Sequence, residues 1–352
     1  MIDEARTFFT ELMETPSPSG YEQPVQKVIR KWSTTHGAEH RTDVHGNVIA
    51  TINPEGRPRV LLDGHCDQIG LIVQYIDENG FLRILPVGGW DTQILLGQRV
   101  TVWADSGPIV GVIARKAPHL LKTEERKKVP EVTDLWVDVG AKSQEEIAEV
   151  VSIGDPVTVA LGFHSMRNGL LCGPKMDDTT GLFSVFDVLR RLSGKKFEAG
   201  LYAVSAVQEE IGLRGAKTAA HGIDPDVGIA VDVTHATDCP TIDKNISGDV
   251  KLGGGPVIFR GPNINPVVFR MLVDLAEANG VPYQLSGANR GTSNDANALQ
   301  MTRSGVATGC LGIPNRYMHS PVEMVAEADL DATAELMALF VENLTADVDF
   351  TP

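Results

Sequence analysis

Two arrangements of apolar and polar residues alternate along most of the chain. Some segments place apolar residues every three or four positions, which predicts amphipathic helices, and others are short apolar runs, which predict buried strands. We predict helices over 1–14, 25–32, 181–192, 214–222, 265–280 and 327–344. We predict strands over 45–52, within 57–76 as two runs, and over 201–207, 226–233 and 306–313. This alternation favours an α/β fold, a mostly parallel sheet with helices on both faces.

The pattern changes between about residue 80 and residue 165. Short segments here alternate apolar and polar residues, and Gly, Pro and Asp turns separate them at fairly regular intervals. This pattern is typical of a small antiparallel β-barrel or sandwich. A basic stretch, 115–132, interrupts it and is expected to be an exposed loop. We therefore predict a discontinuous α/β domain, residues 1–66 and 166–352, and an inserted β-barrel domain, residues 67–165.

The charge of the chain argues against two classes of partner. Its formal net charge is −15 over 352 residues, whereas nucleic acid and anionic membrane surfaces are bound through basic patches. There is no apolar run of about eighteen residues and no signal-peptide pattern, so we expect a cytoplasmic protein. The four cysteines form no Cys-x-x-Cys pair, which argues against a disulfide framework or a thiolate zinc site.

Carboxylates and imidazoles follow the apolar runs of the predicted α/β domain. Ligands bind beyond the carboxyl ends of strands in open α/β sheets, so these residues are candidates for a site. They are Asp63, His65, Asp67, Asp177, Asp178, Glu209, Glu210, Asp232, His235 and His319. Each has an ordinary structural explanation. Asp177 and Asp178, for example, can cap a helix. Glu209 and Glu210 can be solvated or pair with Arg214. These explanations do not account for the presence of carboxylates or imidazoles at all five strand ends.

Carboxylates gathered at one place need positive charge to offset their repulsion. Oxygen and nitrogen ligands without thiolate suit Zn²⁺, Co²⁺ or Mn²⁺. One ion takes about three protein ligands, so five ligands with one bridging carboxylate suit two ions about 3.5–4 Å apart. Such a pair generates hydroxide at neutral pH and stabilises a tetrahedral intermediate. One carboxylate of the Glu209–Glu210 pair is then left as a general base.

Five segments carry a resemblance to a known family. They are GHCDQIG (64–70), KMDDTTG (175–181), VQEEIGLRGA (207–216), VDVTHATD (231–238) and YMHSPVE (317–323). In this order they resemble the co-catalytic metallo-aminopeptidases that include deblocking and glutamyl aminopeptidases, some of which carry an endoglucanase label. The resemblance covers nearly the whole chain, with PSPSGYEQPV near its start. It implies a zinc-peptidase α/β domain with an inserted barrel used for dimerisation. It also implies a homo-oligomer that can reach a tetrahedral dodecamer.

The same resemblance implies which residues hold each of two divalent ions. His65 and Asp232 would bind one metal ion, Glu210 and His319 would bind the other, and Asp177 would bridge them.

Two further residues receive roles from the resemblance. Glu209 would be the general base for the bridging water or hydroxide, and Asp67 would orient His65 from outside the metal site. The implied reaction is hydrolysis of the N-terminal residue of a peptide substrate.

The chain departs from the family pattern at several positions near these residues. Cys66 and Gln68 stand where Met and Glu are common, Thr179 and Thr180 replace a segment that commonly contains Arg, and His235 is an additional imidazole. The departures bear on the substrate rather than on the metals. The alternative is therefore a two-metal deacylase, dipeptidase or amidohydrolase acting on a modified small peptide. An endoglucanase and a non-catalytic assembly protein are the remaining alternatives.

Overall fold

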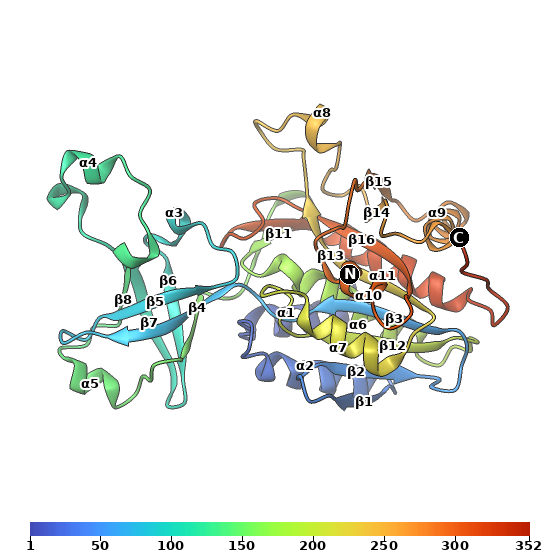
Figure 1. The fold of residues 1–352 in the computed structure, drawn as a ribbon, viewed down its shortest axis with the longest axis horizontal. Helices are drawn as coiled ribbons and strands as arrows, with labels where there is room; N and C mark the ends of the chain where they lie inside the picture. The colour runs from blue at the N-terminus through green and yellow to red at the C-terminus, as the bar shows by residue number, and fades with distance from the viewer.

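The computed structural model of the protein describes residues 1–352, which form an α/β body and a β-barrel beside it (Figure 1). Both ends of the chain belong to the α/β body. Its helices are α1 (Asp3–Glu14), α2 (Gln23–Thr35), η3 (Arg167–Gly169), α6 (Met176–Leu192), α7 (Arg214–Ile223), α8 (Lys244–Ser247), α9 (Pro266–Asn279), α10 (Asp295–Gln300) and α11 (Glu327–Glu342). None of the helices is both long and apolar enough to cross a lipid bilayer.

An eight-stranded sheet forms the centre of the α/β body. Its strands are β1 (Glu39–Thr42), β2 (Val48–Ile52), β3 (Arg59–His65), β12 (Gly200–Ala206), β13 (Val227–His235), β14 (Val257–Arg260), β15 (Gln284–Gly287) and β16 (Ala307–Asn315). The order is β1-β2-β12-β3-β13-β16-β14-β15. The central strands β12, β3, β13 and β16 are parallel, and β2 and β14 run antiparallel to them. The predicted α/β fold with a mostly parallel sheet is confirmed.

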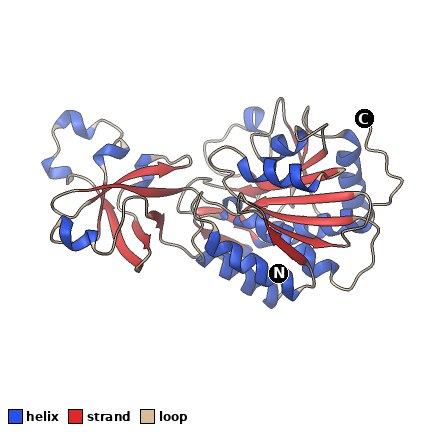
Figure 2. Cartoon of the chain, turned by 60° about the horizontal axis from the view of Figure 1, so that its bottom comes forward, coloured by secondary structure: helices blue, strands red, loops and turns tan.

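Helices cover both faces of this sheet (Figure 2). One face packs against α1, α2, α6, α9 and α11 in a cluster of 47 buried residues, which includes Phe186 of α6 and Phe340 of α11. The other face packs against α7 and α10 in a smaller cluster of 13 buried residues. Full burial of one large apolar side chain contributes roughly 1.5–3 kcal/mol, so the two clusters hold the central strands in fixed positions.

The limits of α9 illustrate how the sequence sets a helix. The side chain of Asn265 accepts hydrogen bonds from the backbone N–H groups of Val267 and Val268. Pro266 begins the helix, where no N–H group is needed. Gly280 ends it in the left-handed region, at φ +65°, which glycine adopts without strain. The predicted helix over 265–280 with a glycine stop is confirmed.

The barrel has its own strands and its own core. The strands are β4 (Gly70–Ile76), β5 (Leu82–Val87), β6 (Arg99–Ala104), β7 (Gly107–Ala114), β8 (Trp136–Asp138) and β9 (Pro156–Val159). They close in the order β4-β5-β8-β7-β6-β9 around 14 buried residues. The short helices are α3 (Thr92–Leu95), η1 (Pro118–Leu120), α4 (Thr123–Arg126), η2 (Val132–Asp134) and α5 (Gln144–Ala148). A closed antiparallel barrel is therefore present, as predicted. The domain limits and the role of the barrel in dimerisation stay predictions.

Two details differ from the expected elements. The basic stretch 115–132 is largely exposed, as expected, but it contains η1 and α4 rather than loop alone. A small sheet of β10 (His164–Ser165), β11 (Leu170–Gly173) and β17 (Glu323–Ala326) lies outside the eight-stranded sheet. Its strands are too short for a periodic pattern to predict them. β11 leads directly into α6, where the first turn carries two adjacent aspartates.

Candidate metal centre

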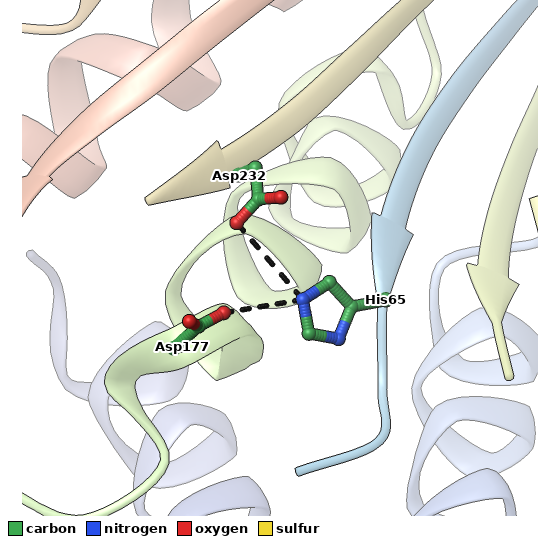
Figure 3. Close-up of side chains that lie close together, drawn as sticks. All are labelled: His65, Asp177 and Asp232. Atoms are coloured by element: carbon green, nitrogen blue, oxygen red, sulfur yellow. Dashed lines mark hydrogen bonds and ion pairs between the residues drawn. The ribbon is translucent and has the colours of Figure 1, made fainter. Parts of the chain in front are cut away.

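His65 and Asp232 reach the site from two neighbouring parallel strands. His65 is the last residue of β3, and Asp232 lies within β13, three residues before its end. Ala230 is paired with Asp63 in the register of these strands, so side chains two residues further along both strands point to the same face. Nε2 of His65 lies 3.9 Å from Oδ1 of Asp232. Figure 3 shows the imidazole directed toward this carboxylate and toward Asp177.

Asp177 and Asp178 are adjacent but have different environments. The backbone at both residues is not helical, so their side chains precede the regular part of α6. Oδ1 of Asp178 accepts a hydrogen bond of 3.0 Å from the backbone N–H of Gly181 and so caps the helix. The carboxylate of Asp177 instead faces the imidazoles. Its Oδ1 lies 3.2 Å from Nε2 of His65, and its Oδ2 lies 3.2 Å from Nε2 of His319.

The ligand atoms form two groups that have one residue in common. The atoms of His65, Asp177 and Asp232 lie within 4.8 Å of one another, and so do those of Asp177, Glu210 and His319. Nε2 of His319 lies 3.5 Å from Oε2 of Glu210. The five residues that sequence reasoning selected as ligands therefore gather at one place, and Asp177 belongs to both groups.

Glu209 and Asp67 lie beside these groups and outside them. Oε2 of Glu209 is 3.9 Å from Nε2 of His65. The carboxylate of Asp67 accepts hydrogen bonds from the backbone N–H groups of Glu209, at 2.9 Å, and Glu210, at 3.2 Å. It also lies 3.4 Å from Nδ1 of His65. Asp67 thus fixes the turn after β12 that carries both glutamates, which sequence reasoning did not foresee.

Both imidazoles are oriented by a backbone carbonyl. Nδ1 of His65 faces the carbonyl oxygen of Asp67 at 3.1 Å, and Nδ1 of His319 faces that of Gly89 at 2.9 Å. A carbonyl only accepts, so Nδ1 carries a proton and Nε2 is directed toward Asp177 and the other carboxylates. This is the arrangement that metal-binding histidines adopt in proteins.

Glu323 is a residue that sequence reasoning missed. Its side chain is buried, 2 % exposed. One carboxylate oxygen accepts from the backbone N–H of Asp177 at 3.0 Å, and the other accepts from that of His319 at 2.7 Å. Glu323 thereby holds the backbone of two candidate ligands. The signal was present, because Glu323 ends the segment YMHSPVE that carried the resemblance.

Ser19 and Gly89 are also close to the site and were not selected from the sequence. Oγ of Ser19 donates to Oδ2 of Asp67 at 2.6 Å, and Ser19 lies within the segment PSPSGYEQPV. Gly89 belongs to the segment that follows β5 of the barrel, far in sequence from its partner His319. No local pattern marks such a glycine, so only the folded structure identifies it.

No lysine or arginine side chain forms an ion pair with the carboxylates of the site, which pair only with the two imidazoles. Burial, followed by the charge of Asp177, raises the pKa of Glu210 and of Asp232 well above the usual range. Burial also raises the pKa of Glu209 to about 8. Oε1 of Glu210 is buried and has no hydrogen-bond partner. Oxygen and imidazole ligands with this excess of negative charge fit divalent cations such as Zn²⁺, Co²⁺ or Mn²⁺.

The histidines respond to the same negative charge. The hydrogen bond with Asp177 raises the pKa of His319. Burial lowers the pKa of His65, but the hydrogen bonds with Asp177 and Asp67 outweigh burial and raise it well above its usual value. Protons on Nε2 therefore take the position in which a metal ion would be bound, and binding of an ion would release them.

A cavity of about 610 Å³ opens over both groups of candidate ligands, and Asp177, Glu210, Asp232 and His319 are among the residues that line it. A larger cavity, about 910 Å³, lies along α11 and contains none of the candidate ligands.

Comparison with known proteins agrees with this chemistry. A profile of the M42 glutamyl aminopeptidase family matches residues 46–336. The chain belongs to this family. This M42 member is 37% identical over 347 residues to the lysyl aminopeptidase of Pyrococcus furiosus, with 97% of this chain and 98% of the relative covered. The predicted family and enzyme class, an aminopeptidase that hydrolyses peptide bonds, are confirmed. M42 enzymes are metallopeptidases, which agrees with the ligand groups.

Solved structures of M42 enzymes have the same fold. The TET aminopeptidase of Thaumarchaeota archaeon SCGC AB-539-E09 superimposes with a TM-score of 0.92 at 34% identity, covering 97% of both chains. The TET1 peptidase of Pyrococcus horikoshii superimposes with a TM-score of 0.86 at 31% identity, covering 97% of this chain and all of the other. That peptidase assembles into a tetrahedron or a large octahedral shell.

The positions at which this M42 member departs from the family pattern differ in exposure. Cys66, Gln68, Thr179 and Thr180 are buried. Oε1 of Gln68 accepts a backbone hydrogen bond, and the hydroxyl of Thr180 donates one. His235 is exposed and lines the cavity over the two groups. Of these departures, His235 is therefore the one that a substrate in the cavity can contact.

Proposed function

We propose that the protein is a two-metal aminopeptidase that removes residues one at a time from the N-terminus of peptides. The observation that carries the proposal is the position of Asp177, whose two oxygens each lie 3.2 Å from the imidazole of a different group. A carboxylate so placed is suited to bridge two ions. His65 and Asp232 would hold one ion, and Glu210 and His319 the other, with zinc, cobalt or manganese as the metal.

The residues around the ions have separate tasks. When bound, two divalent cations supply positive charge that acidifies water and polarises a carbonyl group. Glu209 takes the proton from the attacking water and passes it to the nitrogen of the leaving amine. Its pKa, about 8 because of burial, falls when cations bind nearby, which keeps the carboxylate ionised as a base. Asp67 holds the backbone N–H of Glu209 and so fixes the position of that carboxylate.

The proposal includes assembly into a homo-oligomer. Dimers would form through the barrel and build up to a dodecamer. Support comes from the similar solved structures, one of which is a dodecamer and another a tetrahedron or octahedral shell. The mass of the purified particle, measured by light scattering, tests this part separately from activity.

The activity is tested with two substitutions that change charge but hardly change shape. Glu209→Gln should keep two ions per chain. Its kcat should fall by a factor of about 10²–10⁴, the range that a general base contributes. Asp177→Asn should lower the metal content itself. Metal analysis of both purified variants, beside rates on aminoacyl amides, separates the two effects.

Two results would contradict the proposal. A Glu209→Gln enzyme with near-native rates would exclude Glu209 as the base. Faster hydrolysis of N-acylated dipeptides than of aminoacyl amides by the unmodified enzyme would replace the aminopeptidase with a two-metal deacylase.

A further inference from the structure

The wall of the cavity beside the two metal groups carries no formal charge of its own. Fifteen residues line this cavity, and five of them are Asp177, Glu209, Glu210, Asp232 and His319. The other ten include no Asp, Glu, Lys or Arg. His235 is the one titratable side chain among them. The wall therefore offers no fixed ionic partner to a charged side chain of a substrate.

The apolar part of this wall is built from several elements. Phe259 comes from β14, Leu213 from the turn before α7, and Met318 from the loop after β16. Gly312 of β16 permits the close approach of Phe259 and Thr234. A Cβ atom at position 312 would lie 2.8 Å from Cε2 of Phe259 and 2.7 Å from Cγ2 of Thr234. The wall is thus a packed surface of apolar and hydroxyl-bearing side chains.

The acids of the cavity do not supply the missing ionic partner. Asp177, Glu209, Glu210 and Asp232 are the four carboxylates that line the cavity, and two divalent cations would bring four positive charges. The charges that face the loaded cavity would therefore nearly cancel. A lysine or glutamate side chain that entered the cavity would lose water and gain no opposite charge, which disfavours its binding.

We propose that the enzyme prefers substrates whose N-terminal side chain is uncharged and apolar, of the leucine or methionine kind. Lysine and glutamate, after which relatives in this family are named, are disfavoured. The inference rests on the proposed function, since it assumes that the N-terminal residue of a peptide occupies this cavity. A site built to pair a charge can discriminate strongly, whereas an apolar wall discriminates by about 10- to 200-fold.

The first experiment compares four aminoacyl coumarin amides, of Leu, Met, Lys and Glu, on the metal-loaded enzyme. The Leu and Met amides should have kcat/KM at least about tenfold above the Lys and Glu amides. Equal or faster hydrolysis of the Lys or Glu amide would overturn the inference and leave the aminopeptidase proposal intact. Hydrolysis of none of them would overturn the aminopeptidase proposal instead.

Binding without turnover gives a readout that does not depend on activity. The amino alcohols leucinol and lysinol carry the same amine and differ in side-chain charge. Calorimetric titration should show leucinol binding at least about tenfold more tightly than lysinol. Equal affinities would overturn the inference, whatever the enzyme hydrolyses.

A matched pair of variants tests whether this wall meets the substrate side chain. His235→Asp places an acid on the wall, and His235→Asn gives a similar shape without charge. The Lys-to-Leu ratio of kcat/KM should rise about tenfold in the Asp variant relative to the Asn variant, with equal metal content in both. An unchanged ratio would overturn the assignment of this wall to the N-terminal side chain.

Discussion

The metal site has two halves, a sheet half with His65 and Asp232 and a loop half with Glu210 and His319. Asp177 belongs to both halves, but they are supported in different ways. The side chain of His65 is 2% exposed and belongs to a central strand of the sheet, where the cores on both faces fix it. The side chain of His319 is 36% exposed and follows β16 in a loop, with φ at +60°. One half is thus part of the sheet, and the other depends on contacts between loops.

The loop half is held by residues from distant parts of the chain. Glu323 accepts the backbone N–H of His319, and the carbonyl of Gly89 in the barrel segment orients its ring. Loops open more readily than strands inside a core. The comparison therefore teaches that equal ligand chemistry does not imply equal retention of metal, because the supporting contacts differ.

The largest expected effect is the loss of one ion from one half. His319→Ala should retain about one ion per chain and destabilise the metal-free protein less than His65→Ala does, since this side chain is partly exposed. His65→Ala should also lose an ion. It should further destabilise the metal-free protein by about 1–3 kcal/mol, because buried carboxylates lose a hydrogen-bond partner. Metal analysis and denaturant unfolding after chelation measure both quantities.

The unmodified enzyme provides the control for this prediction. A chelator should remove its ions in two phases, with the faster phase absent in His319→Ala. Removal of both ions in a single phase, or equal destabilisation by the two substitutions, would show that the halves are not supported differently.

Much of the fold could be predicted because buried parallel strands are nearly continuous apolar runs. The runs that became β3, β12 and β13 lead to His65, Glu209 and Asp232, and the topology of the sheet then brings these residues together. Short elements such as α10 and β14 have too few residues for a periodic pattern, so they were missed.

The site was predictable where a side chain carries the chemistry and unpredictable where the backbone does. His319 is recognisable as an imidazole in a segment that resembles the family, whereas the carbonyl of Gly89 has no sequence signal at all. The local pattern does not distinguish the roles of the adjacent acids Asp177 and Asp178, and the bridging role of Asp177 came from the resemblance alone. Only the backbone turn at the start of α6 directs one carboxylate to the site and the other to the helix.

A smaller effect is expected from a change at Ser19, because this residue supports both halves of the metal site through Asp67. Ser19 donates to Asp67, which in turn holds the backbone of Glu209 and Glu210 and approaches His65. Ser19→Ala removes one hydrogen bond to a charged group, worth about 1.5–3 kcal/mol when fully lost. The remaining donors retain part of this, so kcat should fall about five- to tenfold. KM and metal content should change little.

Ser19→Thr restores the hydroxyl and is the matched control. It should recover most of the rate, and steady-state kinetics on one aminoacyl amide measures both variants. If the Ala variant kept the native kcat, or if Thr failed to restore it, Ser19 would not act through Asp67.

The smallest effect should be confined to the loop half. A Cβ atom on Gly89 would lie 3.3 Å from Nδ1 of His319, so Gly89→Ala should displace the ring by a few tenths of an ångström. Gly287→Ala is the control, because a Cβ atom there has no neighbour within 4 Å. Gly89→Ala should weaken binding of the more weakly held ion about two- to tenfold, below the 10- to 100-fold of an outright lost partner. Titration of the metal-free variant with metal ions, measured by calorimetry, should show an unchanged affinity for the more tightly bound ion. A change in the tighter ion instead would mean that the barrel segment supports the sheet half as well, and the two halves would then be less independent than their exposure indicates.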